Sequence, residues 1–247
     1  MIDYDAESDC YDATRGGEPR AVAAATSIER LLPHTARVVV DVGCGSGIVT
    51  RHLAGQQRLV IGVDRSAGMI RLASRRLPRR TVLGDATVLP IRSSTADVVL
   101  MIWVLHLLRD PEPVLAEGAR VLRSGGVLIT TVDKNDAPFR APSDFADVTA
   151  AARRELVPQA SDHHDRILRL AADHDLQPLD EATFVGIGQG RSPRQWREHI
   201  AGGHVAWCQG TDRARIADLC SAISSLSNQE TARPDPIYSL VALERRR

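Results

Sequence analysis

Residues 37–47 read RVVVDVGCGSG, a valine-rich run that leads directly into a glycine cluster. Continuous apolar runs of this kind are typical of a strand buried on both faces of a parallel sheet. The glycines at Gly43, Gly45 and Gly47 let the chain turn sharply and let its backbone approach a ligand closely. The helix expected to begin at Ile48 would direct its free N–H groups toward a negatively charged part of that ligand. The stretch therefore predicts a strand, loop and helix that bind a nucleotide-type cofactor.

The alternation of strand and helix patterns continues along the chain. Strands are expected at 37–42, 59–63, 81–83, 97–102, 127–132, 180–187 and 237–244. Helices are expected at 21–32, 66–77 and 113–122. Strands joined by helices of about ten residues indicate parallel crossover connections. The sequence predicts an α/β fold with a doubly wound, mainly parallel, seven-stranded Rossmann-like sheet.

Three segments are less regular than this alternating part. Residues 1–20 are polar and are expected to form an N-terminal arm or lid. Residues 135–178 and 190–235 are expected to be helical insertions that face the substrate, because they are longer than a strand-to-strand connection needs. No linker rich in Gly, Ser or Pro separates them, so we expect a single domain over 1–247 with an integrated cap.

Composition excludes several functional classes. The 247 residues include 31 basic and 31 acidic side chains, so no electrostatic footprint for nucleic acid or an anionic membrane is visible. No apolar run approaches the roughly 20 residues of a spanning helix, and no signal peptide is recognisable. The four cysteines form no CxxC pair, which argues against a zinc or redox site. We expect a cytoplasmic protein without a metal; the sequence does not indicate its oligomeric state.

The glycine spacing discriminates between cofactors. A dinucleotide fingerprint needs a third glycine at the position of Ile48, and here the pattern is G-x-G-x-G preceded by Asp41. Asp64 ends the second strand, where an acid can accept hydrogen bonds from both hydroxyls of a ribose. Asp85 follows the third strand, where a carboxylate can accept a hydrogen bond from an adenine amine. With Met69 as an apolar wall, these residues predict an adenosine-containing cofactor.

Five motifs occur in an order that resembles the class I S-adenosylmethionine-dependent methyltransferases. They are DVGCGSG (41–47), GVDRS (62–66), GDATVLP (84–90), ADVVLMIWVLHLL (96–108) and ARVLRSGGVLI (119–129). The similarity is greatest to the small-molecule methyltransferases related to the ubiquinone-biosynthesis enzymes, the methyltransferase type 11 group. It covers about residues 37–132 and extends to a Tyr-Asp-x-x-Arg segment at Tyr11 and Arg15.

The resemblance implies S-adenosylmethionine as cofactor and a role for each matching residue. The implied cofactor site consists of Tyr11, Arg15, Asp41, Gly43, Gly45, Asp64, Arg65, Met69, Asp85, Ala86, Met101, Ile102 and Trp103. Those in the glycine loop would line the methionine part, those after the second strand the ribose, and those after the third strand the adenine. Residues 101–103 would border the sulfonium. Tyr11 would cover the cofactor, and Arg15 would reach its carboxylate.

The activity that the resemblance implies is direct displacement of the methyl group by an oxygen or carbon atom of a small-molecule acceptor. His106 lies near the expected transfer point and is the candidate general base, although a packed histidine in an apolar segment is the alternative. Many relatives carry a second histidine at the place of Leu107. Two further alternatives are a macromolecular acceptor and a protein that binds the cofactor without transferring the methyl group.

Other histidines and aromatic residues have weaker signals. His163 and His164 lie among acidic residues, but adjacent helical side chains point about 100° apart and cannot easily bind one metal ion. We therefore expect a helix start there, with Ser161 or Asp162 as its cap. The cap residues His199, His204, Trp196 and Trp207 could border a substrate pocket. We expect surface positions for the histidines and anchoring of the cap helices for the tryptophans.

Overall fold

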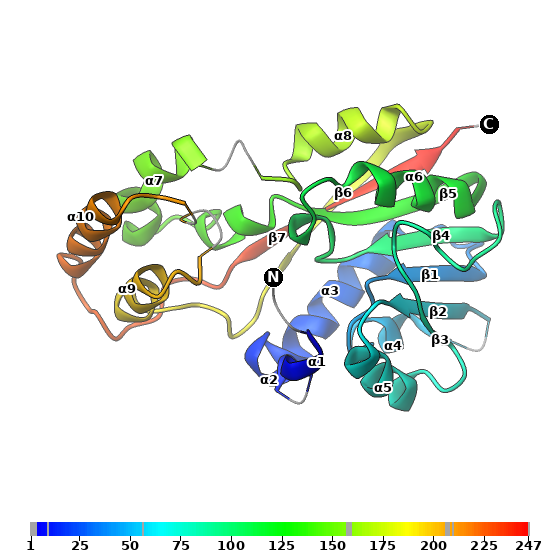
Figure 1. The fold of residues 1–247 in the computed structure, drawn as a ribbon, viewed down its shortest axis with the longest axis horizontal. Helices are drawn as coiled ribbons and strands as arrows, with labels where there is room; N and C mark the ends of the chain where they lie inside the picture. Colours follow the sequence, from blue (N-terminus) through cyan, green and yellow to red (C-terminus); the bar gives the residue numbers. More distant parts are fainter. Residues whose placement is uncertain are drawn as a thin grey trace.

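The computed structural model describes residues 4–8, 10–55, 57–156, 160–205, 208 and 210–246, and these form a central sheet with helices on both faces (Figure 1). The strands are β1 (Val38–Val42), β2 (Leu59–Asp64), β3 (Thr81–Leu83), β4 (Ala96–Met101), β5 (Leu122–Val132), β6 (Leu176–Val185) and β7 (Ile237–Arg245). They form one seven-stranded sheet in the order β3-β2-β1-β4-β5-β7-β6. The first five strands are parallel, and β7 runs antiparallel to both neighbours. The predicted fold class is confirmed.

The strand order creates the place where a ligand can bind. From β1 the chain moves outward to β2 and β3, and then returns to the other side of β1 with β4 and β5. The loops after β1 and β4 therefore leave in opposite directions, which opens a crevice at the carboxyl ends of these strands.

Helices cover the sheet on both faces. They are α1 (Tyr4–Glu7), α2 (Tyr11–Thr14), α3 (Gly17–Leu31), α4 (Thr50–Leu53), α5 (Ala67–Arg76), η1 (Leu105–Leu107), α6 (Glu112–Val121), η2 (Lys134–Phe139), α7 (Asp144–Leu156), α8 (His164–Ala172), α9 (Pro193–Ala201) and α10 (Arg213–Ser224). Successive strand residues point to opposite faces, so Val39 packs in the core under α3 while Val40 packs in the core under α6 and α8. Both valines are fully buried, as the valine run predicts.

The start of α8 differs from the sequence-based expectation. His163 is its N-cap and makes no side-chain capping bond, so the predicted cap by Ser161 or Asp162 is wrong. Ser161 donates its hydroxyl to the carbonyl of Leu105 (2.9 Å), and Asp162 accepts the backbone N–H of Lys134 (2.9 Å). Asp133, from the loop after β5, accepts the N–H of His164 instead (3.1 Å). Tertiary contacts thus replace local capping.

A helical cap lies beside one end of the sheet and has its own apolar core (Figure 1). Its buried side chains come from η2, α7, α9, α10 and the segment between α9 and α10, and include Phe139, Phe145, Trp196 and Ile223. The rings of Phe145 and Trp196 are stacked with centroids 4.8 Å apart. Trp207 lies outside the described residues. By contrast α8 packs on the sheet, so the expected insertion 135–178 divides between the cap and the sheet.

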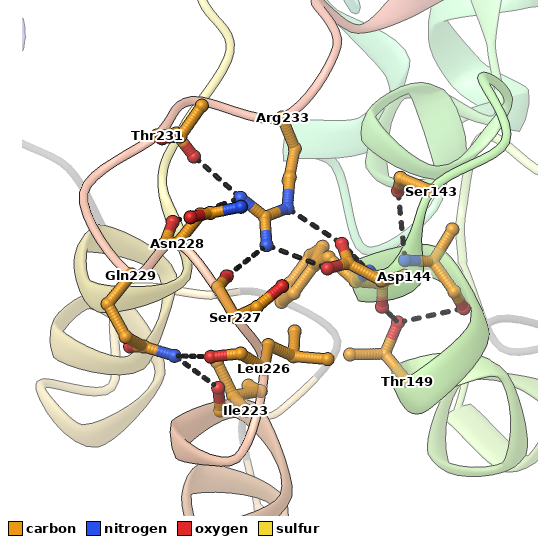
Figure 2. A network of polar contacts seen from close by, with 12 residues as sticks. Ser143, Asp144, Thr149, Ile223, Leu226, Ser227, Asn228, Gln229, Thr231 and Arg233 are labelled. Carbon is orange, nitrogen blue, oxygen red and sulfur yellow. Dashed lines mark hydrogen bonds and ion pairs between the residues drawn. The ribbon is translucent and has the colours of Figure 1, made fainter.

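Arg233 ties the cap together from the loop after α10 (Figure 2). Its guanidinium donates to both carboxylate oxygens of Asp144 at the start of α7, each at 2.7 Å. It also donates to the carbonyls of Ser227, Asn228 and Thr231. A bidentate arginine–carboxylate pair fixes orientation as well as distance, so this contact joins two cap segments 89 residues apart in sequence.

Among the described residues, no helix combines the length and apolar character needed to span a membrane.

Candidate active site

A cavity of about 310 Å³ opens at the carboxyl ends of the central strands, beneath the N-terminal arm. Eleven of the thirteen predicted cofactor residues line it, all except Arg15 and Met101. The lining also includes residues outside the five motifs, namely Tyr4, Arg20, Ile48, Val49, Arg109 and Val114. The cavity therefore gathers residues from the arm, the glycine loop and the ends of four strands.

The glycine loop adopts a backbone that side chains would obstruct. Gly43 and Gly45 have φ of +70° and +55°, in the left-handed region that favours glycine. A Cβ on Gly43 would lie 2.5 Å from Cγ2 of Val104. The amide of Gly43 donates to the carbonyl of Val63 at the end of β2 (2.7 Å). The loop is thus held between β2 and the segment after β4, and it lines the cavity, as close approach to a cofactor requires.

Asp64 joins this loop to the start of α5. Its two carboxylate oxygens accept the backbone N–H groups of Gly45 (2.8 Å) and Ser66 (2.9 Å). Burial raises the pKa of Asp64, and the two amide hydrogen bonds oppose that effect. Each carboxylate oxygen can accept more than one hydrogen bond, so Asp64 keeps capacity for ribose hydroxyls.

The other two acids differ in environment. Asp41 is buried and accepts the hydroxyl of Thr50. Burial raises its pKa to about 7, partly opposed by that hydrogen bond. Asp85 is exposed and accepts the N–H and hydroxyl of Thr87 (2.8 and 2.7 Å), which lowers its pKa. Asp41 therefore shapes the floor of the loop, while Asp85 presents an ionised carboxylate at the rim.

The N-terminal arm is fixed over the cavity by two acids. Asp5 accepts the hydroxyl of Ser66 (2.7 Å) and the N–H of Gly68 (2.6 Å) at the start of α5. Asp12 accepts the hydroxyl of Ser46 in the glycine loop and the guanidinium of Arg76 (2.7 Å). These contacts place the arm's aromatic rings, Tyr4 and Tyr11, in the cavity wall with centroids 5.9 Å apart.

The two predicted residues outside the lining have other contacts. The Arg15 guanidinium forms an ion pair with Glu7 (3.0 Å) and lies 5.6 Å from the centre of the Tyr11 ring. Met101 is completely buried in β4, where its side chain faces Gly118 of α6. Met101 thus packs between β4 and α6 and does not line the cavity.

Trp103 forms the wall next to β4. It has φ of +57°, a rare conformation for a bulky residue, and its backbone N–H donates to the hydroxyl of Thr131 (2.8 Å). The guanidinium of Arg20 lies 3.9 Å from the centre of its ring. Phe184 and Tyr238 contact the indole edge-on, at 5.7 and 5.6 Å. Strained residues of this kind concentrate at functional sites.

His106 lies in η1, next to the cavity and outside its lining. Its Nδ1 is shielded from solvent and has no hydrogen-bond partner among the described residues. Burial lowers the pKa of His106 well below its usual value, so the ring is neutral at pH 7 and is in the form that can accept a proton.

The histidines at His164, His199 and His204 have other contacts. The ring nitrogens of His164 contact Asp165 and Glu181, each at 3.0 Å. Within the described part of the chain no group of three or more potential metal ligands occurs. The rings of His199 and His204 lie 5.4 Å apart in the cap; His199 is half-buried and His204 is exposed.

Comparison with known proteins agrees with this geometry. Residues 40–130 match the family model of a methyltransferase domain. The chain is 37% identical over 103 residues to an uncharacterized methyltransferase of Mycobacterium tuberculosis, which covers 41% of this chain and 42% of that protein. It is 35% identical over 105 residues to the demethylmenaquinone methyltransferase of Renibacterium salmoninarum, covering 41% of this chain and 44% of that protein. The matches thus span less than half of these curated relatives.

A solved structure extends the likeness over the whole chain. A methyltransferase of Haloferax volcanii, in complex with the Trm112 methyltransferase activator, has a TM-score of 0.63 and 16% identity, covering 100% of this chain and 99% of that chain. At that identity the likeness shows the fold alone.

The sheet order, the glycine loop and the matching domain define a Rossmann-like methyltransferase. Residues 40–130 and the sheet order agree with the class I S-adenosylmethionine-dependent methyltransferases, and S-adenosylmethionine is the cofactor that this domain indicates. The described residues fit S-adenosylmethionine. They include a glycine loop in which a Cβ on Gly43 would fill the space, acids at the strand ends, and Met69 as an apolar wall.

Proposed function

We propose that this chain transfers the methyl group of S-adenosylmethionine to an oxygen or carbon atom of a small-molecule acceptor. The observation that carries the proposal is the covered cavity, in which cofactor-binding residues and the apolar wall of Trp103 lie under the arm. Such an enclosed, partly aromatic space suits a small acceptor. The relative from Renibacterium salmoninarum, a demethylmenaquinone methyltransferase by name, supports a small acceptor from a cofactor pathway.

The cofactor supplies an electrophilic methyl group when it is bound. The residues of the chain would supply alignment and exclusion of water, which can account for much of the rate of a direct displacement. The glycine loop and Asp64 would hold the cofactor in one orientation. Tyr4 and Tyr11 would close the cavity above it.

An acceptor whose reacting atom carries an acidic hydrogen must lose that proton, and His106 is the proposed base. Its neutral ring and its unpaired Nδ1 support that role. His106 does not line the cavity, so this role needs a movement of η1 or of the acceptor before contact. An acceptor that is already ionised would need no base.

Labelled cofactor tests the proposal. The protein is incubated with S-adenosylmethionine carrying a radioactive methyl group and with an extract of the source organism, which is then separated into an ultrafiltrate and a macromolecular fraction. We expect protein-dependent label in the ultrafiltrate together with S-adenosylhomocysteine. Label confined to protein or nucleic acid would contradict a small-molecule acceptor. Cofactor binding with no label in either fraction would favour a binding protein or other sulfonium chemistry.

A further inference from the structure

Four cations, of which one lines the cavity, lie close enough to repel one another, although the chain as a whole is neutral. They are Arg15 after α2, Arg20 in α3, Lys134 in η2 and Arg191 before α9. Arg15, Arg20 and Arg191 each repel Lys134 electrostatically, and Arg15 also repels Arg20 and Arg191. Elements far apart in the sequence therefore bring like charges to one place.

Arg20 is the best placed of these cations to meet a ligand. Arg20 lines the cavity, and the residue is only 8% exposed. Its guanidinium lies over the Trp103 ring and is hydrogen-bonded to Tyr238. Next to it the indole Nε1 of Trp103 is shielded from solvent and has no acceptor among the described residues. Arg20 and Trp103 both line this cavity, and each carries a buried donor.

Carboxylates do not balance this charge. Glu7 forms an ion pair with Arg15, and Asp162 acts on Lys134 from beyond ion-pair distance. Among the described residues no ion pair joins a carboxylate to Arg20 or Arg191. Buried charges without a counter-charge are costly, which makes an anionic ligand favourable at this place.

The lowered pKa of Lys134 agrees with this excess of cations. Burial lowers its pKa to about 8, and repulsion by Arg15, Arg20 and Arg191 adds to that effect. Burial lowers the pKa of His106, and the charges of Lys134, Arg15 and Arg20 lower it further. An anion bound among them would relieve this repulsion.

Building on the methyl transfer proposed above, we propose that the methyl acceptor carries an acidic group, a carboxylate or a phosphate. This group binds the guanidinium of Arg20 and the indole N–H of Trp103, within the positive field of the surrounding cations. The acceptor would then be held by its acidic group while its reacting atom lies nearer the cofactor.

The carboxylate of the cofactor does not remove the need for this second anion. S-adenosylmethionine brings one carboxylate together with an ammonium and a sulfonium, so its binding adds net positive charge. The cations named above would remain in excess when the cofactor is bound. An acidic acceptor would neutralise this excess.

Small probes test the proposal on the protein loaded with S-adenosylhomocysteine. Benzoate, phenyl phosphate and the neutral benzyl alcohol are titrated while the Nε1–H resonance of Trp103 is followed by NMR in ¹⁵N-labelled protein. The resonance is assigned by its loss in Trp103→Phe. We expect saturable shifts with at least one anionic probe and binding at least tenfold weaker for benzyl alcohol. The anionic probe that binds more tightly shows whether the site prefers a carboxylate or a phosphate.

Variants separate this site from the cofactor site. Arg20→Gln is expected to weaken the anionic probe at least tenfold and to change the Kd of S-adenosylhomocysteine less than twofold. Arg30→Gln is the matched control, because Arg30 is exposed on the same helix. Lys134→Met, expected to weaken the probe about threefold, serves as an independent variant if Arg20→Gln fails to fold.

Three results would overturn the proposal. One is equal binding of the anionic and neutral probes. Another is no probe binding by a protein that binds S-adenosylhomocysteine, which leaves the proposed function intact. The third is a parallel loss of probe and cofactor affinity in Arg20→Gln, which would assign Arg20 to the cofactor carboxylate. Failure of wild-type protein to bind S-adenosylhomocysteine would instead contradict the proposed function.

Discussion

The carboxylate of Asp64, at the end of β2, accepts the backbone N–H of Gly45 at 2.8 Å. This hydrogen bond joins the residue proposed to hold the ribose to the loop proposed to hold the methionine part. A second bond, from the N–H of Ser66, extends the connection to the start of α5. The proposed cofactor site is therefore one hydrogen-bonded unit, and a substitution in the loop, at Asp64 or at the start of α5 should alter the position of the other two.

Gly43→Ala should destabilise both the fold and the cofactor site. A left-handed conformation costs a non-glycine residue about 1–2 kcal/mol, and overpacking adds about 1–3 kcal/mol. Gly125→Ala is the control, because Gly125 has a similar φ of +73° with no atom within 4 Å of its Cβ position. We expect Gly43→Ala to lower the free energy of unfolding in urea more than Gly125→Ala does. The double variant with Val104→Ala should recover part of the difference; no recovery would contradict the contact with Val104.

Asp41 should make stability depend on pH. Burial raises its pKa in the folded state to about 7, from 3.8, so the folded protein binds this proton more tightly than the unfolded chain. The stabilising contribution of the protonated group is therefore lost as the pH rises from about 4 to 7. In cofactor-free protein, Asp41→Asn should gain stability relative to wild type over that range, by at most about 1.4 kcal/mol for each pH unit. A difference between the two proteins that is constant with pH would show that Asp41 titrates normally.

His106→Asn tests the proposed base. With an acceptor whose reacting atom must lose a proton, we expect kcat to fall at least tenfold, while the Kd of S-adenosylhomocysteine stays within twofold of wild type. General base catalysis contributes about 10²–10⁴-fold to rates, so a loss of that size is measurable. A near-normal kcat at saturating acceptor would assign His106 to packing.

Arg233→Lys should loosen the cap without changing the cofactor site (Figure 2). Lysine keeps the charge but cannot make the bidentate contact with Asp144. Hydrogen bonds to charged groups contribute about 1.5–3 kcal/mol, and the Asp144 side chain is 40% exposed, so we expect a loss of about 2 kcal/mol in urea unfolding.

The exposed pair of Arg194 and Glu230 provides the control for this variant. Arg194→Lys should cost less than 1 kcal/mol, because exposed ion pairs contribute little. Equal effects of the two substitutions would argue against the role given to Arg233.

The sheet was predictable because the valine-rich runs and their spacing depend on local pattern. All seven strands occur at the expected places, with ends shifted by a few residues. The start of α8 was not predictable in the same way. Ser161 and Asp162 have the chemistry of helix caps, but Leu105 and Lys134, distant in sequence, take their hydrogen bonds.

The candidate site was predictable where motifs follow strands. Asp64 and Asp85 lie at strand ends, and parallel strands bring those ends to one edge of the sheet. Tyr4 and Arg20 carry no such signal, because their place in the cavity depends on how the arm and α3 cross that edge. Their types gave a partial hint: a tyrosine and an arginine within an arm already expected to cover the cofactor.

Calorimetric titration with S-adenosylhomocysteine tests most directly whether the cavity is the cofactor site. Wild-type protein should bind it and should not bind NADH. Asp64→Ala should weaken binding by about 10-fold to 150-fold, because a hydrogen bond to a charged group contributes about 1.5–3 kcal/mol. Asp180→Ala, at an exposed position in β6, should leave the Kd unchanged. An unchanged Kd in Asp64→Ala, or binding of NADH in place of S-adenosylhomocysteine, would contradict the assignment of this site.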